Sequence, residues 1–374
     1  MTDATAPASA PSGPAPDPAV VDDVAQLTPE WFDVVLGTAG TAASVRSVST
    51  EPVGTGQMAS TVRAHLVLGD GLDRTVVVKY ARADVESAMA AMAYAKEVAF
   101  YRELGDRVAA RTPDCLYAAM TAGAPRFVLV LEDMADAVQG DQIAGCPVEH
   151  AEAAVVNLAG LHGPTWCDAE LEAAAWLGSD GAITSDFMAP VIDMAADAFA
   201  ERFAAELDPV EADVLAAARE LLPRWMFERG ERTAVVHGDY RLDNLLFPEG
   251  DPARVAAVDW QTTAVGPPVR DLAYFLSTCL TVDDRRAHER DLVEVYRRAL
   301  ADHDVTDFPA DDCWDDYVDG MLHGPLIILL GRLTAGVTER GDEMFRVMWR
   351  RVSAAIDDLG TLDAVRARLD VRPR

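Results

Sequence analysis

The chain has 374 residues, of which 50% are hydrophobic, and it carries a formal net charge of −30. Its length exceeds what one compact core usually accommodates and suits two lobes. Its acidity excludes binding of nucleic acid through a basic face. The charge itself has two interpretations that the sequence leaves open: a generally acidic, soluble surface, or a field that attracts a cationic substrate.

Residues 1–26 are rich in Ala, Pro, Ser and Asp and contain few large apolar side chains, which predicts a disordered tail. This tail has neither a basic start nor an apolar core, so it does not resemble a signal peptide. The most apolar later run, residues 321–333, is interrupted and too short to span a bilayer, which predicts a core helix. Five widely spaced cysteines without a C-x-x-C pair predict reduced thiols, and we expect a cytoplasmic protein with no membrane partner.

A turn with two glycines lies between strand-like runs, at residues 51–60. Small residues there would let backbone N–H groups approach phosphates. The candidate nucleotide contacts in this turn are Gly54, Gly56, Gln57 and Met58. Most Gly-x-Gly pairs are only turns, so this one gains weight from the elements that follow it.

A β-branched strand at residues 75–80 contains Lys79, the first lysine of the chain. The ammonium group of a lysine in a buried strand suits the α- and β-phosphates of a nucleotide, and the alternative is a solvated strand end. The next helix is predicted at residues 84–104 from its content of Ala, Met and Glu, and it offers Glu97 as the partner of Lys79. Two other glutamates compete for that role, Glu86 and Glu103.

The most informative segment runs from His237 to Asn244 and is followed by Asp259. Three strands are predicted around these residues, at 233–236, 244–247 and 255–258, with a Pro- and Gly-containing turn at 248–252. Antiparallel pairing brings the open ends of a hairpin together. We therefore expect Asn244 and Asp259 to reach one metal ion.

Three of these polar residues have the types that a phosphoryl-transfer site uses. One carboxylate, Asp239, would orient an attacking hydroxyl group, while Asn244 and Asp259 would hold Mg²⁺ against ATP. Singly, each has a simpler interpretation as a turn former or a cap, and their joint spacing favours catalysis. Arg241 has two open interpretations: a bidentate bond to the transferring phosphoryl group, or a salt bridge to Asp243 or another carboxylate.

The spacing of this segment resembles the kinase catalytic loop. His-Gly-Asp in place of His-Arg-Asp is similar to the aminoglycoside phosphotransferases and choline kinases. Four further segments resemble the ecdysteroid-kinase-like branch of that superfamily, at residues 56–63, 131–134, 158–162 and 270–274. The elements follow kinase order, and the resemblance covers roughly residues 45–350.

This resemblance implies an α/β (α+β), two-lobed, protein-kinase-like fold with ATP between the lobes. The small nucleotide-binding lobe, residues 27–134, would hold a twisted antiparallel sheet and one helix, and the larger lobe, residues 135–374, would be mostly helical. The strand at 125–131 would lead into a hinge whose backbone, at Glu132 and Met134, bonds the adenine edge. The resemblance also implies a packed helix position for His162 and a structural tie by Asp271.

The sequence departs from the protein-kinase pattern after Asp259. Trp260 and Gln261 replace the usual Phe-Gly, and only eleven residues separate Asp259 from Asp271. This spacing leaves no room for a phosphorylated activation loop and favours a small-molecule hydroxyl acceptor, either an apolar alcohol or an aminoglycoside-like compound, over a protein. The alternative is a non-catalytic kinase-like protein that binds a nucleotide or a partner.

Overall fold

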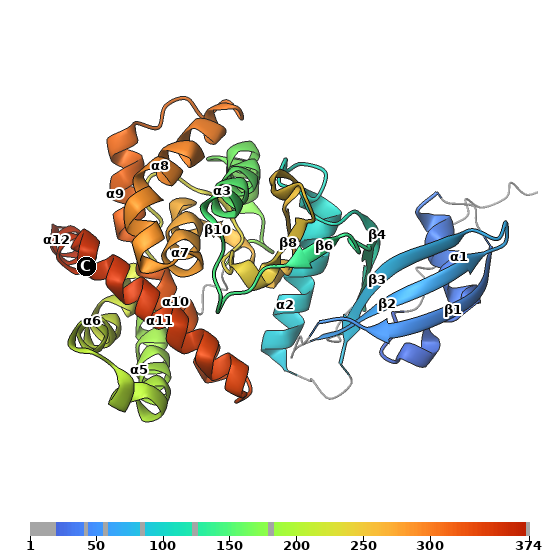
Figure 1. Ribbon diagram of the computed structural model, residues 1–374, viewed down its shortest axis with the longest axis horizontal. Coiled ribbons are helices and arrows are strands. Elements are labelled where there is room, and N and C mark those ends of the chain that lie inside the picture. The colour runs from blue at the N-terminus through green and yellow to red at the C-terminus, as the bar shows by residue number, and fades with distance from the viewer. Residues whose placement is uncertain are drawn as a thin grey trace, which may run out of the picture.

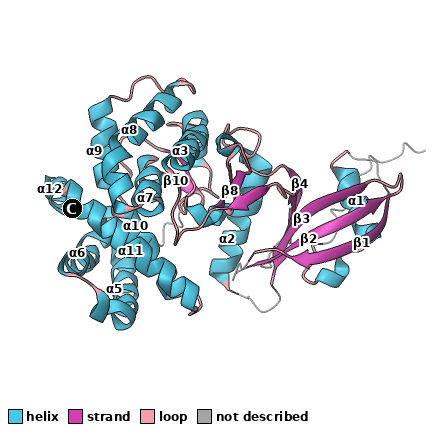
Figure 2. Ribbon diagram, in the orientation of Figure 1, coloured by secondary structure: helices cyan, strands magenta, loops and turns pink. Residues whose placement is uncertain are grey.

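The computed structural model describes residues 20–40, 44–54, 59–82, 87–121, 126–178 and 183–371. A twisted sheet forms one end of the elongated molecule and a group of helices forms the other (Figure 1). Figure 2 shows that the long strands gather at the first end, whereas the strands within the helical part are short. This arrangement is the predicted two-lobed α/β fold. The candidate catalytic segment, from His237 to Asp259, lies on the side of the helical lobe that faces the sheet (Figure 1).

The sheet of the small lobe has five antiparallel strands in the order β1-β2-β3-β5-β4. They are β1 (Val45–Pro52), β2 (Ala59–Leu68), β3 (Asp73–Ala81), β4 (Cys115–Met120) and β5 (Phe127–Glu132). Side chains alternate between the two faces of a strand, so Val76 and Val78 enter a core on one face of β3. Lys79 points to the other face, with Leu129 of β5 as its cross-strand partner.

Helix α1 (Pro29–Thr38) covers the Val76 face, and its side chains Phe32, Val35 and Leu36 are buried there. The Thr28 hydroxyl accepts a hydrogen bond from the Trp31 N–H and Pro29 occupies the first helical position, a favourable start for a helix. The prediction of one helix in this lobe is therefore wrong, because α1 accompanies the predicted one.

Residues 20–26, which were predicted to belong to a disordered tail, have a described structure, whereas residues 1–19 lie outside the described residues. A single turn of 3₁₀-helix spans Val24–Gln26 and is closed by a capping box between Asp23 and Gln26. Val21 is buried in the core beneath α1, so residues 20–26 are part of the small lobe. Their order follows from the burial of this apolar side chain, which the composition of the whole segment concealed.

Helix α2 (Ala88–Ala99) covers the opposite face of the sheet and continues as one π-helical turn, Phe100–Leu104. It begins later than predicted, because the Ser87 hydroxyl caps it by accepting from the Ala90 N–H. Tyr94 stacks on Phe127 of β5, with ring centroids 4.4 Å apart. This packing fixes α2 against the sheet and turns Glu97 toward Lys79. The alternative partner Glu86 lies outside the described residues.

Strands of two small antiparallel sheets flank the polar residues of the candidate catalytic segment. One pairs β7 (Ala234–Val236) with β10 (Ala264–Gly266), and the other has the order β6-β8-β9, with β6 (Ala137–Gln139), β8 (Leu245–Pro248) and β9 (Ala256–Ala257). The predicted hairpin is present and shorter than expected, since Asn244 ends a 3₁₀ turn at Leu242–Asn244. The strands β6 and β10 were not predicted. β10 extends only three residues, too few for a periodic pattern to show.

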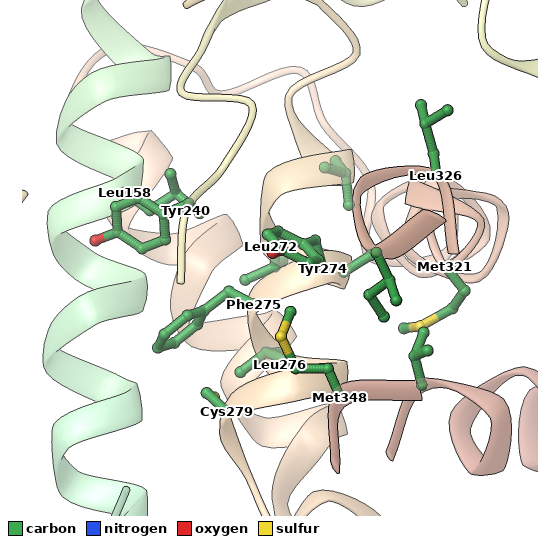
Figure 3. Packing of buried hydrophobic residues seen from close by; sticks show 14 of the residues in the cluster. Leu158, Tyr240, Leu272, Tyr274, Phe275, Leu276, Cys279, Met321, Leu326 and Met348 are labelled. Carbon is green, nitrogen blue, oxygen red and sulfur yellow. The ribbon is translucent and has the colours of Figure 1, made fainter. Parts of the chain in front are cut away.

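The large lobe contains ten described α-helices. They are α3 (Val148–His162), α4 (Ala169–Ala173), α5 (Ser185–Phe203), α6 (Pro209–Trp225), α7 (Val269–Cys279), α8 (Val282–Ala301), α9 (Ala310–Gly320), α10 (His323–Thr334), α11 (Glu339–Leu359) and α12 (Thr361–Val371). Helix α7 is the central one, and its Phe275 points toward α3 while Met321 and Met348 lie on the other side (Figure 3). The predicted core helix at 321–333 corresponds to α10. In the part of the chain that the structure describes, no helix has the length and apolarity that crossing a bilayer requires.

Candidate functional site

The backbone of the His237–Gly238–Asp239 loop is held by a buried carboxylate. Asp271, in the first turn of α7, accepts hydrogen bonds from the N–H groups of His237 (2.6 Å) and Gly238 (3.0 Å). Burial disfavours its charged form, but the adjacent His162 ring keeps the pKa of Asp271 below its ordinary value. Asp271 thus ties the loop to the helical lobe, as the sequence suggested, and His162 is a fully buried helix residue.

Gly238 is required at its position. Its φ is +82°, and a Cβ there would lie 2.8 Å from the carbonyl oxygen of Thr262. An L-residue would meet both a strained backbone conformation and a backbone clash. The close approach places the loop directly against the segment that follows Asp259.

The carboxylate of Asp239 accepts three side-chain hydrogen bonds. The Tyr274 hydroxyl donates to Oδ1 (3.0 Å), while Arg241 Nε (3.1 Å) and Asn244 Nδ2 (3.0 Å) donate to Oδ2. Asn244 Nδ2 also donates to the backbone carbonyl of Asp239 (2.9 Å). These contacts fix the direction of a carboxylate whose side chain is 23% exposed.

Arg241 is held between two carboxylates. Besides Asp239, its guanidinium contacts Asp243 (Nη1–Oδ2, 3.2 Å). Arg340 of α11 also donates to both carboxylate oxygens of Asp243. Burial disfavours the charge of Arg241, yet the two acids raise its pKa. Of the two interpretations left open by the sequence, the salt bridge is the one that the geometry contains.

Lys79 connects two acidic residues from different lobes. Its Nζ lies 2.7 Å from Glu97 Oε1 and 3.1 Å from Asp259 Oδ1. Burial opposes its charge, but these two carboxylates raise the pKa of Lys79 above the ordinary value, so it remains an ammonium ion at neutral pH. The structure therefore brings together the predicted lysine, helix glutamate and second aspartate. Glu103, the other candidate within the described chain, is an exposed residue of the π-helical turn that follows α2.

The hairpin places Asp259 beside Asn244. Val258 N–H donates to the Asn244 carbonyl at the open ends of β8 and β9 (3.0 Å), which is the juxtaposition that the strand pattern predicted. Asp259 has φ +70°, a conformation uncommon outside glycine that directs its carboxylate toward Lys79. Asn244 uses its amide nitrogen on Asp239, which leaves its amide oxygen for a cation.

These two residues fit a magnesium ion better than a softer metal. Mg²⁺ is usually bound by one or two carboxylates together with substrate phosphates and water, and the side chain of Asp259 is 40% exposed. In the described ranges, no group of three or more His, Cys, Asp and Glu side chains forms a metal cage. A divalent cation held by Asn244 and Asp259 would therefore need further oxygen ligands, such as water or phosphate.

Three contacts that sequence reasoning missed join α2 and the π turn after it to residues 260–263, which follow Asp259. The Trp260 ring stacks on Phe100, with centroids 3.7 Å apart and planes 5° apart. Gln261 Nε2 lies 3.4 Å from Glu97, and Lys96 Nζ donates to the Thr263 carbonyl (2.7 Å). We call these three contacts the α2 latch, since they hold the Glu97 helix against the Asp259 segment.

The hinge after β5 is already engaged in strand pairing. The Glu132 N–H donates to the Asp114 carbonyl (2.8 Å), and Met134 is buried. Arg63 of β2 grips Asp133 with two bonds, Nε–Oδ2 (2.8 Å) and Nη2–Oδ1 (3.2 Å). This ion pair, which the sequence did not reveal, connects the strand that follows the glycine turn to the hinge.

Of the four residues proposed in the glycine turn, only Gly54 is described, and it has φ +74°; Gly56, Gln57 and Met58 lie outside the described residues. A hollow of about 370 Å³ beside Gly54 is lined by Val62 and Tyr80. Those side chains belong to the core under α1, on the face opposite Lys79.

The sequence matches a known protein family, and the fold resembles solved structures. The model of the ecdysteroid kinase-like family matches residues 60–305. Among solved structures, choline kinase from Cryptosporidium parvum Iowa II has a TM-score of 0.54 at 10% identity, covering 84% of this chain and 91% of that one. The GDP complex of an aminoglycoside 2'-phosphotransferase-IIIa variant has a TM-score of 0.50 at 15% identity, covering 86% and 97%. At these identities the likeness concerns the fold.

Two curated relatives match over a short stretch. Acyl-CoA dehydrogenase family member 10 of Mus musculus is 42% identical over 60 residues, which is 15% of this chain and 6% of that protein. Acyl-CoA dehydrogenase family member 11 of Homo sapiens is 32% identical over 62 residues, 16% of this chain and 8% of that protein. The matched stretch is thus a small part of either relative.

Proposed function

This chain belongs to the ecdysteroid kinase-like family, and on that premise we propose that it transfers the γ-phosphate of ATP to a hydroxyl group of a small molecule. One observation carries the proposal: Lys79, paired with Glu97, also contacts Asp259, next to a fixed Asp239–Asn244 pair. A structural ion pair would need only two partners. An ammonium ion shared by both lobes is what binding of a triphosphate between them would require.

Asp239 would accept a hydrogen bond from the acceptor hydroxyl and orient its oxygen toward the γ-phosphorus. A bond from that oxygen to phosphorus forms as the bond from phosphorus to the bridging oxygen of ADP breaks, and ADP leaves with the electron pair. The hydroxyl proton passes to Asp239 and then to water. The transition state is loose, so positioning and charge neutralisation matter more than basicity.

Lys79 would bind the α- and β-phosphates. Backbone groups of Glu132 and Met134 would bond the base, apart from the Glu132 N–H, which already donates to Asp114. Asn244 and Asp259 would hold Mg²⁺, which, when bound, neutralises charge on the phosphate oxygens. Arg241 would act mainly by holding Asp239, since both of its acidic neighbours already engage it.

The charges next to Asp239 favour an uncharged acceptor over an aminoglycoside-like cation. Asp243, which shares Arg241 with Asp239, is paired with both Arg241 and Arg340. Acids that are neutralised by arginine attract a cation weakly. The net charge of −30 is then better explained by the general surface than by the residues around Asp239.

The test is ADP release from Mg²⁺ and ATP, with GTP in parallel, across acceptors of different chemistry. The panel should contain sterol-like alcohols, aminoglycosides, choline-like amines and sugars, together with hydroxylated acyl-CoA thioesters, which the names of the curated relatives motivate. Protein substrates should remain unlabelled. Magnesium-dependent nucleotide binding without turnover on any acceptor would instead support the non-catalytic alternative.

Asp239→Asn should then reduce turnover of the identified acceptor by on the order of a thousandfold while nucleotide binding, measured by calorimetry, persists. Asp251→Asn is the matched control, because Asp251 is an exposed residue in the turn of the β8–β9 hairpin, and its turnover should be unchanged. Near-wild-type turnover by Asp239→Asn would refute the proposed role of Asp239.

A further inference from the structure

Helix α7 holds the catalytic loop at two successive levels. Asp271 in its first turn binds the backbone of His237 and Gly238, and Tyr274, three residues later, reaches the side chain of Asp239. Residues three apart lie on the same face of a helix. One rigid, buried element therefore positions both the loop and its carboxylate.

The two oxygens of the Asp239 carboxylate are occupied unequally. A carboxylate oxygen accepts about two hydrogen bonds in its plane. Oδ2 accepts from Arg241 Nε and Asn244 Nδ2, which fills it. Within the described chain, Oδ1 has the Tyr274 hydroxyl as its side-chain donor, so Oδ1 is the oxygen with capacity for the hydroxyl of an acceptor.

We propose that Tyr274 is a positioning residue for the transfer, which presents Oδ1 of Asp239 to the acceptor hydroxyl. This inference rests on the proposed phosphotransferase function. The Tyr274 hydroxyl occupies one side of Oδ1, so the acceptor must approach from the other side. Loss of the hydroxyl would leave the carboxylate anchored at Oδ2 alone and free to rotate about that end.

The surroundings of Tyr274 suit this role. The side chain is fully buried, and its ring meets His323 edge-on, with centroids 5.5 Å apart and planes 82° apart. His323 Nε2 is hydrogen-bonded to the Gly238 carbonyl (3.0 Å). The His323 ring that packs on Tyr274 is therefore itself fixed to the loop that contains Asp239. Burial raises the pKa of the Tyr274 hydroxyl well above its usual value, which keeps it a hydrogen-bond donor.

The test compares two Tyr→Phe substitutions that remove the same group from similar settings. Tyr317 is also fully buried, and its hydroxyl donates a hydrogen bond to a carboxylate, Glu289 Oε2, at 3.2 Å. Within the described part of the chain, it makes no hydrogen bond to His237, Gly238 or Asp239. Both substitutions should lower stability by similar amounts, because each removes one buried hydrogen bond. Only the change at position 274 should affect the transfer.

With the acceptor identified by ADP release, Tyr274→Phe should lower kcat roughly 10- to 100-fold, the effect expected for losing a hydrogen bond to a charged group. The KM for ATP should stay within about twofold, since the Tyr274 hydroxyl bonds Asp239 whereas Lys79 bonds Glu97 and Asp259. Tyr317→Phe should match the wild type. Equal kcat in the wild type and Tyr274→Phe would overturn the inference while leaving the proposed function intact.

A structure of Tyr274→Phe gives a readout that needs no activity. The Asp239 carboxylate should adopt a different rotamer or several conformers, while the backbone from His237 to Asp239 stays in place. An Asp239 side chain in its original orientation would overturn the inference even if no acceptor were found. A wild-type protein without turnover would refute the proposed function separately.

Discussion

Gly238→Ala is expected to damage both stability and catalysis, and Gly250→Ala separates the two physical causes. Gly238 and Gly250 have similar φ values, +82° and +76°, but a Cβ at Gly238 would lie 2.8 Å from the Thr262 carbonyl oxygen and 3.1 Å from the Thr262 Cβ, whereas nothing lies within 4 Å at Gly250. Gly250→Ala therefore measures the cost of the backbone conformation, and Gly238→Ala adds the clash.

The left-handed conformation costs an L-residue about 1–2 kcal/mol, and overpacking against an unyielding backbone costs about 1–3 kcal/mol more. We expect Gly250→Ala to lower the free energy of unfolding by about 1–2 kcal/mol and Gly238→Ala by about 2–5 kcal/mol. Urea denaturation followed by tryptophan fluorescence measures both values. Equal losses of unfolding free energy at the two sites would refute the reasoning, because the contacts with Thr262 at position 238 would then add no cost beyond that of the left-handed conformation.

The same pair separates stability from catalysis. The Thr262 hydroxyl donates to the His237 carbonyl (2.7 Å), so the shift that accommodates a Cβ at position 238 moves the loop before Asp239. A displacement of about 1 Å at a reacting group costs on the order of a hundredfold in rate. Turnover by Gly238→Ala should fall accordingly at temperatures where the protein remains folded, and Gly250→Ala should retain full turnover.

Two further predictions concern the α2 latch and the tie beneath the loop. Lys96→Met should weaken ATP binding about 5- to 30-fold, the effect of 1–2 kcal/mol, because the loosened helix would hold Glu97 against Lys79 less often. Calorimetry measures the affinity, and Lys96→Arg should restore part of it. An unchanged affinity for ATP would show that the α2 latch is dispensable. Asp271→Asn should flatten the loss of stability in acid. Folding lowers the pKa of Asp271 from its ordinary value of 3.8. Its contribution to the free energy of unfolding is therefore complete above pH 3.8 and is lost as the pH falls through the lower folded pKa. An acid-denaturation curve of Asp271→Asn with the same shape as that of the wild type would contradict this.

The geometry of the candidate catalytic segment was predictable because its information is local. The spacing from Asp239 to Asn244 and the strands before Asp259 are read directly from neighbouring residues, and antiparallel pairing supplies the remaining contact. The pairing of Lys79 with Glu97 needed one further step, the assumption that a helix follows the strand and crosses the face from which the lysine projects.

The missed contacts join residues far apart in the chain. Tyr274 lies 35 positions after Asp239, and Lys96 lies 167 positions before Thr263. No periodic pattern connects such residues, because their meeting depends on how whole helices pack. The partner of Arg241 stayed open for a similar reason: the sequence gives its charge, and only the fold decides which carboxylates surround it.

Helix α1 was missed although the sequence contains its start signal. Thr28 followed by Pro29 is a helix cap, yet the assumed single helix of the small lobe had been assigned to the segment containing Glu97. A resemblance to a known architecture can thus hide an additional element.

The ammonium groups that serve Glu97, Asp259 and Thr263 belong to Lys79 and Lys96, and these are the only two lysines in the chain. Amine-directed reagents, such as those used to attach dyes, biotin or resins, therefore have side-chain targets only at Lys79 and Lys96, within or beside the proposed nucleotide site. Coupling through the exposed thiol of Cys167 should spare it. Loss of labelling at Lys79 when a nucleotide is present would report occupancy by mass spectrometry without any enzymatic readout.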